Sequence, residues 1–122
     1  MRFANPLPFV ADMSRSKAFY RDVLSLTVSE DHGDFVLFEG GFALHDGPSL
    51  HERAFGRPDA AGAPYGRQNL VLYFETPDLD AAFERVAAGA AILHPIRTEP
   101  WGGRVFRVLD PDGHVVEVGE AG

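Results

Sequence analysis

Apolar positions along this chain follow two patterns, the alternation of β-strands and the spacing of amphipathic helices. The clearest strand is residues 68–75, where Asn-Leu-Val-Leu-Tyr-Phe runs without a breaker. Helical spacing follows at Leu79, Ala82 and Val86, after a Pro-Asp helix-start signal. Similar spacing at Ala18 follows a first, proline-containing segment that is typical of an edge strand. The predicted strands are residues 5–10, 34–38, 42–46, 68–75, 91–94, 105–109 and 114–118, with one helix after the first of them and one after the fourth.

The C-terminal run predicts a β-hairpin. Two β-rich segments flank the turn sequence Asp-Pro-Asp-Gly, in which proline presets φ and glycine tolerates a positive φ. Alternation on the last strand places Val115 and Glu117 on one face, with Val116 and Val118 on the other. A carboxylate among apolar neighbours makes Glu117 the first candidate functional residue.

Three segments lack strand or helix patterns. Residues 47–66 are rich in Gly, Pro and Ala and predict a long connecting loop, of a length that is often functional or mobile. Residues 95–102 predict a shorter loop, and residues 29–33 a polar break. The long loop could close over a bound molecule.

The second half of the chain repeats the first. Residues 5–19 align with residues 69–83 without gaps, and the far ends align once about eight extra residues are placed in the second half. The matched positions are Asn5 with Asn69, Phe9 with Tyr73, Val10 with Phe74, Ala18 with Ala82, Phe19 with Phe83 and His45 with Glu117. We therefore predict an α+β fold in which two tandem βαβββ modules form curved mixed sheets within a single domain, residues 1–122. Module one covers approximately residues 1–46, the connecting loop residues 47–66, and module two approximately residues 67–122.

Composition excludes several classes of function. The formal net charge is −7 and no basic stripe is present, which argues against a nucleic-acid binder. The chain has no cysteine, so disulfides, thiolate metal sites and cysteine nucleophiles are excluded. No apolar run reaches the length of a membrane span, and the opening residues lack the hydrophobic core of a signal peptide. These features predict a soluble cytoplasmic protein without a membrane partner.

Other charged and aromatic residues suggest no further site. Arg104 and Arg107 lie on opposite faces of one predicted strand, and a solvated surface position is the default for each. His114 follows the turn and is expected at the surface. The remaining histidines show no metal-ligand spacing; they are His32, His51 and His94.

Residues 9–24, residues 70–74 with the helix that follows them, and residues 101–117 carry a resemblance to a known superfamily. In these segments, and in the internal repeat, the chain resembles the vicinal oxygen chelate superfamily. Its members include glyoxalase I, extradiol dioxygenases, and the fosfomycin and bleomycin resistance proteins. The resemblance implies that the sheets of the two modules enclose a cleft, and that the chain forms a homodimer.

The metal-dependent members of this superfamily place four ligands at equivalent positions in their two modules. Carried over to this sequence, those positions hold Asn5, His45, Asn69 and Glu117. The resemblance thus implies His45 and Glu117 as metal ligands, whereas an amide oxygen is a poor substitute for imidazole on zinc, nickel or iron. Such a set suits one weakly held divalent ion or no metal, and His45 and Glu117 could instead form a structural hydrogen-bonded pair.

Two functions are therefore consistent with these residues, and a third is less favoured. The first is binding of a small organic molecule in the cleft, with polar contacts from the residues at the four ligand positions. The expected apolar walls are Phe9, Tyr73, Trp101, and Phe42 or Phe55. The second is a divalent-metal enzyme of the glyoxalase I, resistance-transferase or dioxygenase type, in which Glu117 or Tyr73 acts catalytically by moving a proton. The third is a regulatory domain that keeps the fold without the chemistry. Because two imidazoles are missing, the binding function is favoured.

Overall fold

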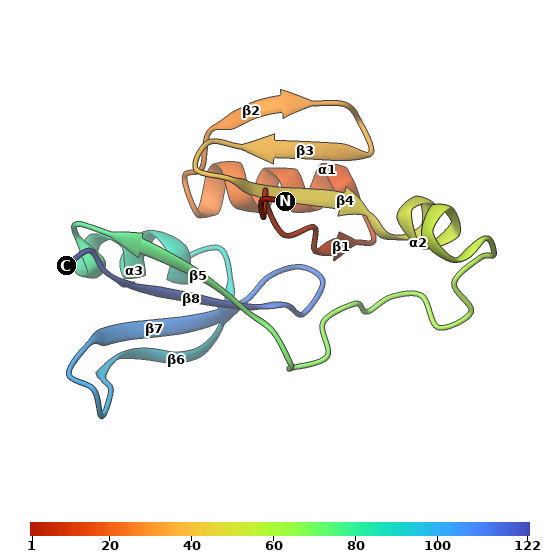
Figure 1. The fold of residues 1–122 in the computed structure, drawn as a ribbon. Helices are drawn as coiled ribbons and strands as arrows, with labels where there is room; N and C mark the ends of the chain where they lie inside the picture. Colours follow the sequence, from red (N-terminus) through yellow and green to blue (C-terminus); the bar gives the residue numbers. More distant parts are fainter. The chain divides into compact units, whose positions relative to one another are not determined.

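A computed structural model describes residues 1–122 and consists of two compact units, residues 1–65 and residues 66–122 (Figure 1). The first unit contains β1 (Phe9–Val10), α1 (Met13–Ala18), the π-helical turn η1 (Phe19–Val23), β2 (Val28–Asp31), β3 (Phe35–Phe38), β4 (Phe42–Asp46) and α2 (Gly47–Phe55). The second contains β5 (Val71–Thr76), α3 (Leu79–Ala87), β6 (Ala91–Thr98), β7 (Arg104–Leu109) and β8 (Val115–Glu120).

Each unit forms one four-stranded mixed sheet with the same topology. The strand orders are β1-β4-β3-β2 and β5-β8-β7-β6, in which the first strand of each unit pairs in parallel with its last strand. The other neighbours are antiparallel. The predicted α+β fold with tandem βαβββ modules is therefore confirmed. None of the helices has the length and apolar character needed to cross a lipid bilayer.

The core of the first unit lies between its sheet and the helical segment α1–η1. Asp12 caps α1 by accepting a hydrogen bond from the Arg15 N–H at 3.1 Å. The chain then continues into the π turn, in which the Leu24 N–H donates to the Phe19 carbonyl at 3.1 Å. The side chains that fill this core are Val10, Phe19, Tyr20, Val36, Phe38, Ala43 and Leu44.

The core of the second unit lies between its sheet and α3. Asp78 caps this helix through the Ala81 N–H at 3.1 Å, and the helix buries Leu79, Ala82 and Val86 against the sheet. The opposing strands contribute Leu72, Phe106, Val108, Val116 and Val118. Burial of the last two confirms the alternation predicted for the final strand, with Glu117 on the other face.

The prediction of a loop over residues 47–66 was wrong for its first half, which forms α2. Asp46 caps this helix by accepting a hydrogen bond from the Ser49 N–H at 3.0 Å, and a proline lies at its first positions. Gly56 ends the helix with φ of 76°. The Pro and Gly residues that suggested a loop therefore lie at the ends of a short helix, where each is favoured.

Two strands of the antiparallel meanders also differ from prediction. β2 lies where a polar break was expected, because its side chains are mostly exposed and carry no alternation of apolar residues. β6 continues through Pro95 to Thr98 instead of ending at His94. It is an edge strand with two register shifts, and proline is tolerated in such strands.

Candidate ligand-binding site

Backbone register places four of the predicted site residues, Phe9 and His45 in one sheet and Tyr73 and Glu117 in the other, in equivalent rows of the two sheets. In the first unit, the Cα partners of His45 are Phe9 on β1 and Phe35 on β3. In the second unit, the Cα partners of Glu117 are Tyr73 on β5 and Arg107 on β7. The two rows have the same topology, so the alignment of His45 with Glu117 and of Phe9 with Tyr73 is confirmed.

The row of the first unit is aromatic. The Phe9 ring packs edge-to-face on Tyr65, with ring centroids 5.6 Å apart, and the Phe35 ring lies 6.2 Å from the imidazole of His45. Tyr65 also lies against Gly47, where an added Cβ would stand 2.6 Å from its hydroxyl oxygen. Asn5 precedes β1, and its side-chain N–H donates to the Pro6 carbonyl at 2.9 Å.

His45 presents a basic nitrogen in this row. Its Nδ1 lies 3.0 Å from the Asp46 carbonyl oxygen. Because a carbonyl oxygen only accepts, the proton of the neutral ring must be on Nδ1. The Nε2 atom of this half-buried side chain then carries a lone pair that can accept a hydrogen bond from a ligand.

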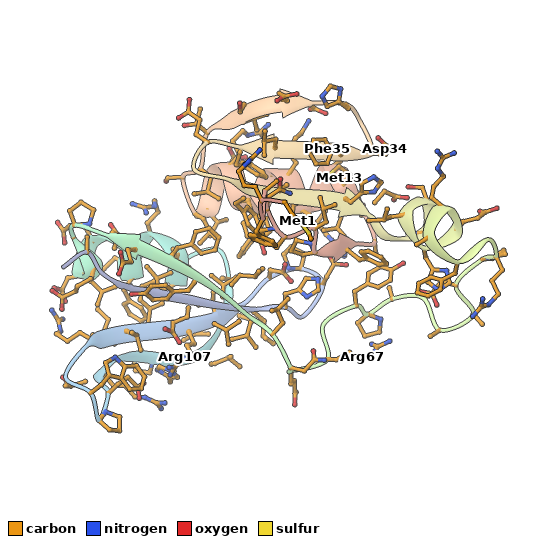
Figure 2. All side chains as sticks on the ribbon, in the orientation of Figure 1. Met1, Met13, Asp34, Phe35, Arg67 and Arg107 are labelled. Atoms are coloured by element: carbon orange, nitrogen blue, oxygen red, sulfur yellow. The ribbon has the colours of Figure 1, made fainter.

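The row of the second unit is ionic and centres on Arg107, which is labelled on β7 in Figure 2. The Arg107 Nε–H donates to Glu117 Oε1 at 2.7 Å, and Nη1 donates to Glu99 Oε1 at 2.8 Å. Nη1 also lies 3.0 Å from His94 Nε2, while His94 Nδ1 donates to the Pro95 carbonyl at 2.7 Å. Glu99 additionally accepts from Arg97 Nε at 2.9 Å. The expectation of a solvated Arg107 was therefore wrong, since its side chain is 18% exposed and holds two carboxylates.

These contacts shift the pKa values of Arg107 and Glu99. Burial alone would lower the pKa of Arg107, but the hydrogen bonds to Glu99 and Glu117 outweigh it and raise that pKa. Hydrogen bonds from Arg97 and then Arg107 hold the pKa of Glu99 below its usual range. Arg107 is thus a permanent cation beside two carboxylates, and the neutral His94 ring accepts its remaining Nη1 proton.

Tyr73 lies next to Glu117 on the open face of the same sheet. Its side chain is 51% exposed, and its hydroxyl donates to Glu75 Oε2 at 2.8 Å. This hydrogen bond is the largest cause of a raised pKa for Tyr73, with burial and the charges of Glu75 and Glu117 adding to it. Gly119 on the neighbouring strand leaves room for the ring, since an added Cβ would lie 2.7 Å from the Tyr73 hydroxyl oxygen. Tyr73 is therefore a protonated hydrogen-bonding group with an accessible aromatic surface.

The two remaining predicted residues lie outside the row. Asn69 is exposed and precedes β5, which begins only at Val71, and Gln68 before it has φ of 60°. Trp101 lies in the turn between β6 and β7, where it is 68% exposed. His114, expected at the surface, is buried instead, with 8% exposure. The structure thus pairs Phe9 with His45 and Tyr73 with Glu117, and it places Asn69 and Trp101 on flanking segments.

The side chains at the four predicted ligand positions do not fit a tightly held divalent metal. His, Asp and Glu side chains form no group of three or more that could hold a metal ion. Glu117, the best match to a metal ligand, already accepts a hydrogen bond from a guanidinium at 2.7 Å. His45 is a competent nitrogen ligand, but Asn5 contributes only an amide, which suits zinc, nickel or iron poorly.

The side chains of Arg107, Glu117, Glu99, Arg97 and His94 form one hydrogen-bonded group, the Arg107 cluster. Sequence reasoning missed three of its members, namely Arg107, Glu99 and His94. Arg107 was missed because pairing symmetric about the four-residue turn would place it opposite Val116, whereas the observed hairpin is centred on Asp112 and pairs Arg107 with Glu117. Glu99 and His94 carried no pairing signal. Their segment was expected to end as a strand at His94, whereas register shifts in β6 bring His94 opposite Arg107.

The ion pairs of Glu99 predict a loss of stability in acid. Its pKa is lowered in the folded state, so its contribution is present above the pKa of the unfolded chain and disappears as pH falls through the folded-state pKa. In denaturant titrations, Glu99→Gln should be less stable than wild type at about pH 7, with the difference closing towards about pH 3. Glu84→Gln, the same change on the exposed side of α3, is the matched control. A difference that does not depend on pH would contradict this role of Glu99.

Comparison with a family model of glyoxalase-like domains gives a match over residues 3–121, nearly the whole chain. The chain belongs to the glyoxalase-like domain family. Its fold is that of the glyoxalase/bleomycin resistance/dioxygenase superfamily, as the sequence resemblance implied. No curated protein sequence matches the chain at a significant level.

Solved structures similar to this glyoxalase-like chain cover nearly all of it. A protein of unknown function from Agrobacterium tumefaciens str. C58 is 54% identical, with a TM-score of 0.95 over 99% of this chain and 94% of that one. A glyoxalase/bleomycin resistance protein/dioxygenase from Nocardioides is 27% identical, with a TM-score of 0.76 over 98% and 83%. A lactoylglutathione lyase from Agrobacterium tumefaciens is 28% identical, with a TM-score of 0.71 over 98% and 93%.

Proposed function

We propose that this glyoxalase-like chain binds a small organic molecule and does so without a metal ion. The observation that carries the proposal is the 2.7 Å hydrogen bond from Arg107 Nε to Glu117 Oε1. The carboxylate that best matches a metal ligand of the superfamily is already paired with a side-chain cation. A charge-assisted hydrogen bond of this kind competes directly with metal coordination.

Each of the two sheets, taken by itself, carries side chains that suit an organic ligand. On the second sheet, Val71 and Tyr73 are 47% and 51% exposed, which offers apolar and aromatic surface beside polar groups. On the first sheet, Phe9 pairs with His45 and its ring packs on Tyr65, and Nε2 of His45 can accept a hydrogen bond. That both rows contact one molecule in a cleft stays a prediction. Association as a homodimer belongs to the same proposal and is measured by light scattering in solution.

Metal binding by wild type and Glu117→Ala tests the proposal. The protein is purified without chelator, its metal content is measured, and Mn²⁺, Ni²⁺, Zn²⁺ and Mg²⁺ are titrated into both proteins. We expect no stoichiometric metal in either, because a divalent ion would have to displace the Arg107 guanidinium from Glu117. One metal ion per wild-type chain that is lost in Glu117→Ala would contradict metal-free binding.

A thermal-shift screen of small aromatic and oxygen-rich compounds then identifies the ligand class. Tyr73→Ala should weaken binding of a hit by about tenfold, since it removes an accessible aromatic contact and a hydroxyl donor. Leu93→Ala on edge strand β6, a residue 49% exposed, is the control and should leave affinity unchanged. Equal affinities for wild type, Tyr73→Ala and Leu93→Ala would show that Tyr73 does not contact the ligand.

A metal-dependent lyase, transferase or dioxygenase is the second candidate function. It is favoured by the 28% identity to a protein described as a lactoylglutathione lyase and by the available Nε2 of His45. In that function His45 and Glu117 would be the ligands, and Glu117 or Tyr73 would move a proton. The raised pKa of Tyr73 makes this phenol a poor proton donor near neutral pH, which disfavours it in that role. The metal titration separates the two functions.

A further inference from the structure

Arg107, labelled on β7 in Figure 2, has hydrogen-bond donors that no protein group uses. Its Nε–H donates to Glu117, and its Nη1 donates to Glu99 and lies 3.0 Å from His94 Nε2. The remaining nitrogen, Nη2, makes no hydrogen bond or ion pair with any other residue. No side-chain nitrogen or oxygen atom of a partly or fully buried residue is both buried and without a partner, so Nη2 reaches the surface. Its N–H groups are available to a bound molecule.

These donors lie on the face of the second sheet that points away from α3. Arg107 pairs with Glu117, and Glu117 pairs with Tyr73, so the three side chains share one face of the sheet. The neighbouring residues on β7, Phe106 and Val108, are buried on the opposite face. Two spacings between strands, about 10 Å, separate the backbone of Arg107 on β7 from that of Tyr73 on β5.

The guanidinium is held in one orientation before any ligand binds. Its plane is fixed by acceptors on β8, on β6 and on the segment just after β6, which are bonded to two different nitrogen atoms. The direction of the Nη2 N–H groups is therefore fixed as well, because a guanidinium is planar and rigid. A ligand atom that accepts from Nη2 does not have to immobilise a flexible side chain, which favours binding.

The charges around Nη2 favour an uncharged acceptor. Arg107 already donates to Glu99 and Glu117, and Glu99 also accepts from Arg97. A third carboxylate, Glu75, accepts the tyrosine hydroxyl on β5, so this face carries three carboxylates against two guanidinium groups. A ligand carboxylate or phosphate at Nη2 would lie close to carboxylates that share the same cation, and like charges repel. The carbonyl oxygen of an amide or ketone accepts the same hydrogen bond without that repulsion.

We propose that Arg107 is a ligand-binding residue whose Nη2 donates to the carbonyl oxygen of an uncharged ligand, while an apolar part of that ligand contacts Val71 and Tyr73. These two side chains are 47% and 51% exposed. The Tyr73 ring lies against Gly119 of β8, where an added Cβ would stand 3.1 Å from its Cε1 atom, so the ring leans over the strand between β5 and β7. The ligand class is an aromatic amide or ketone that spans about 10 Å. This inference rests on the proposed binding function and adds the chemistry of the ligand.

Cinnamamide and cinnamate, which have nearly the same size and differ in charge, test the ligand class. Their affinities for the wild-type protein are measured by NMR titration at high salt, where the net charge of −7 is largely screened. We expect the amide to bind about tenfold or more tightly than the carboxylate. Equal affinities, tighter binding of cinnamate, or no binding of either probe up to its solubility limit would overturn the inference.

Arg107→Lys tests the role of the guanidinium itself. Lysine keeps a positive charge beside Glu99 and Glu117 but lacks the rigid fork of donors, so the affinity for cinnamamide should fall by about tenfold. Arg104→Lys is the matched control on the opposite face of β7, where Arg104 binds Asp80 and Glu120. This variant should keep the affinity of wild type. A fall in both variants, or in neither, would overturn the role of Arg107.

A measurement on the wild type covers the case in which Arg107→Lys does not fold. With isotope-labelled arginine, the guanidinium signal of Arg107 should shift when cinnamamide is added, whereas that of Arg104 should not. An Arg107 signal that does not shift at saturating cinnamamide would overturn the inference.

Failure of this inference and failure of the proposed function give different results. A thermal-shift hit that loses affinity in Tyr73→Ala but not in Arg107→Lys would overturn the role of Arg107, while the binding function would stand. Stoichiometric metal in wild type that is lost in Glu117→Ala would contradict the metal-free function, and the inference with it.

Discussion

Phe106→Ala should lower the free energy of unfolding by about 3–5 kcal/mol, the usual cost of removing a fully buried phenylalanine. The side chain of Phe106 is 0% exposed on the helix-facing side of β7. Its ring packs edge-to-face against Phe83 of α3, with centroids 5.2 Å apart. The substitution leaves a cavity between sheet and helix, and the loss is both the transfer free energy of the ring and the contacts of its neighbours.

The measurement is a denaturant titration followed by circular dichroism, with Phe3→Ala as the matched control. Phe3 is 81% exposed, so the same chemical change there should alter stability by no more than about 0.5 kcal/mol. A loss below about 1 kcal/mol in Phe106→Ala would mean that the sheet and α3 do not depend on this ring.

Gly66→Ala is the second substitution expected to have a large effect, and the reason is a contact between two backbones. Gly66 lies against the turn that joins β7 and β8, where its N–H donates to the Asp112 carbonyl at 3.0 Å. An added Cβ would overlap the carbonyl group of Gly113 and lie 2.6 Å from the His114 nitrogen. Backbone atoms of a tight turn cannot rotate away, so we expect a loss of about 3 kcal/mol, at the upper end for overpacking.

Gly103→Ala is the matched control for this effect. A Cβ there would meet the indole nitrogen of Trp101 at 2.8 Å, a distance that is also too short. Trp101 is 68% exposed, so its side chain can move into solvent at little cost. Thermal melts should therefore separate the two variants clearly. Equal melting temperatures would mean that residue 66 moves as easily as an exposed side chain.

Local pattern predicted most of the fold. Period-two alternation identified the buried face of β8, and the Asp-Pro-Asp-Gly turn predicted the hairpin that contains it. The repeat of residues 5–19 in residues 69–83 predicted that both units have the same order of elements, because equivalent sequences form equivalent local structure. It also aligned His45 with Glu117, which the strand register confirms.

Pairing between residues far apart in sequence decided the features of the fold that local patterns did not predict. Whether Pro95 lies in a loop or in an edge strand depends on β7 being available as a partner, which residues 91–98 do not encode locally. The helix α2 was missed because its capping residues have the composition of a loop. The sequence alone determined the superfamily, the two modules and the candidate carboxylate Glu117. Only the tertiary structure placed Arg107, Glu99 and His94 around one another, because hydrogen bonds between side chains far apart in sequence form only once register and bulges are set.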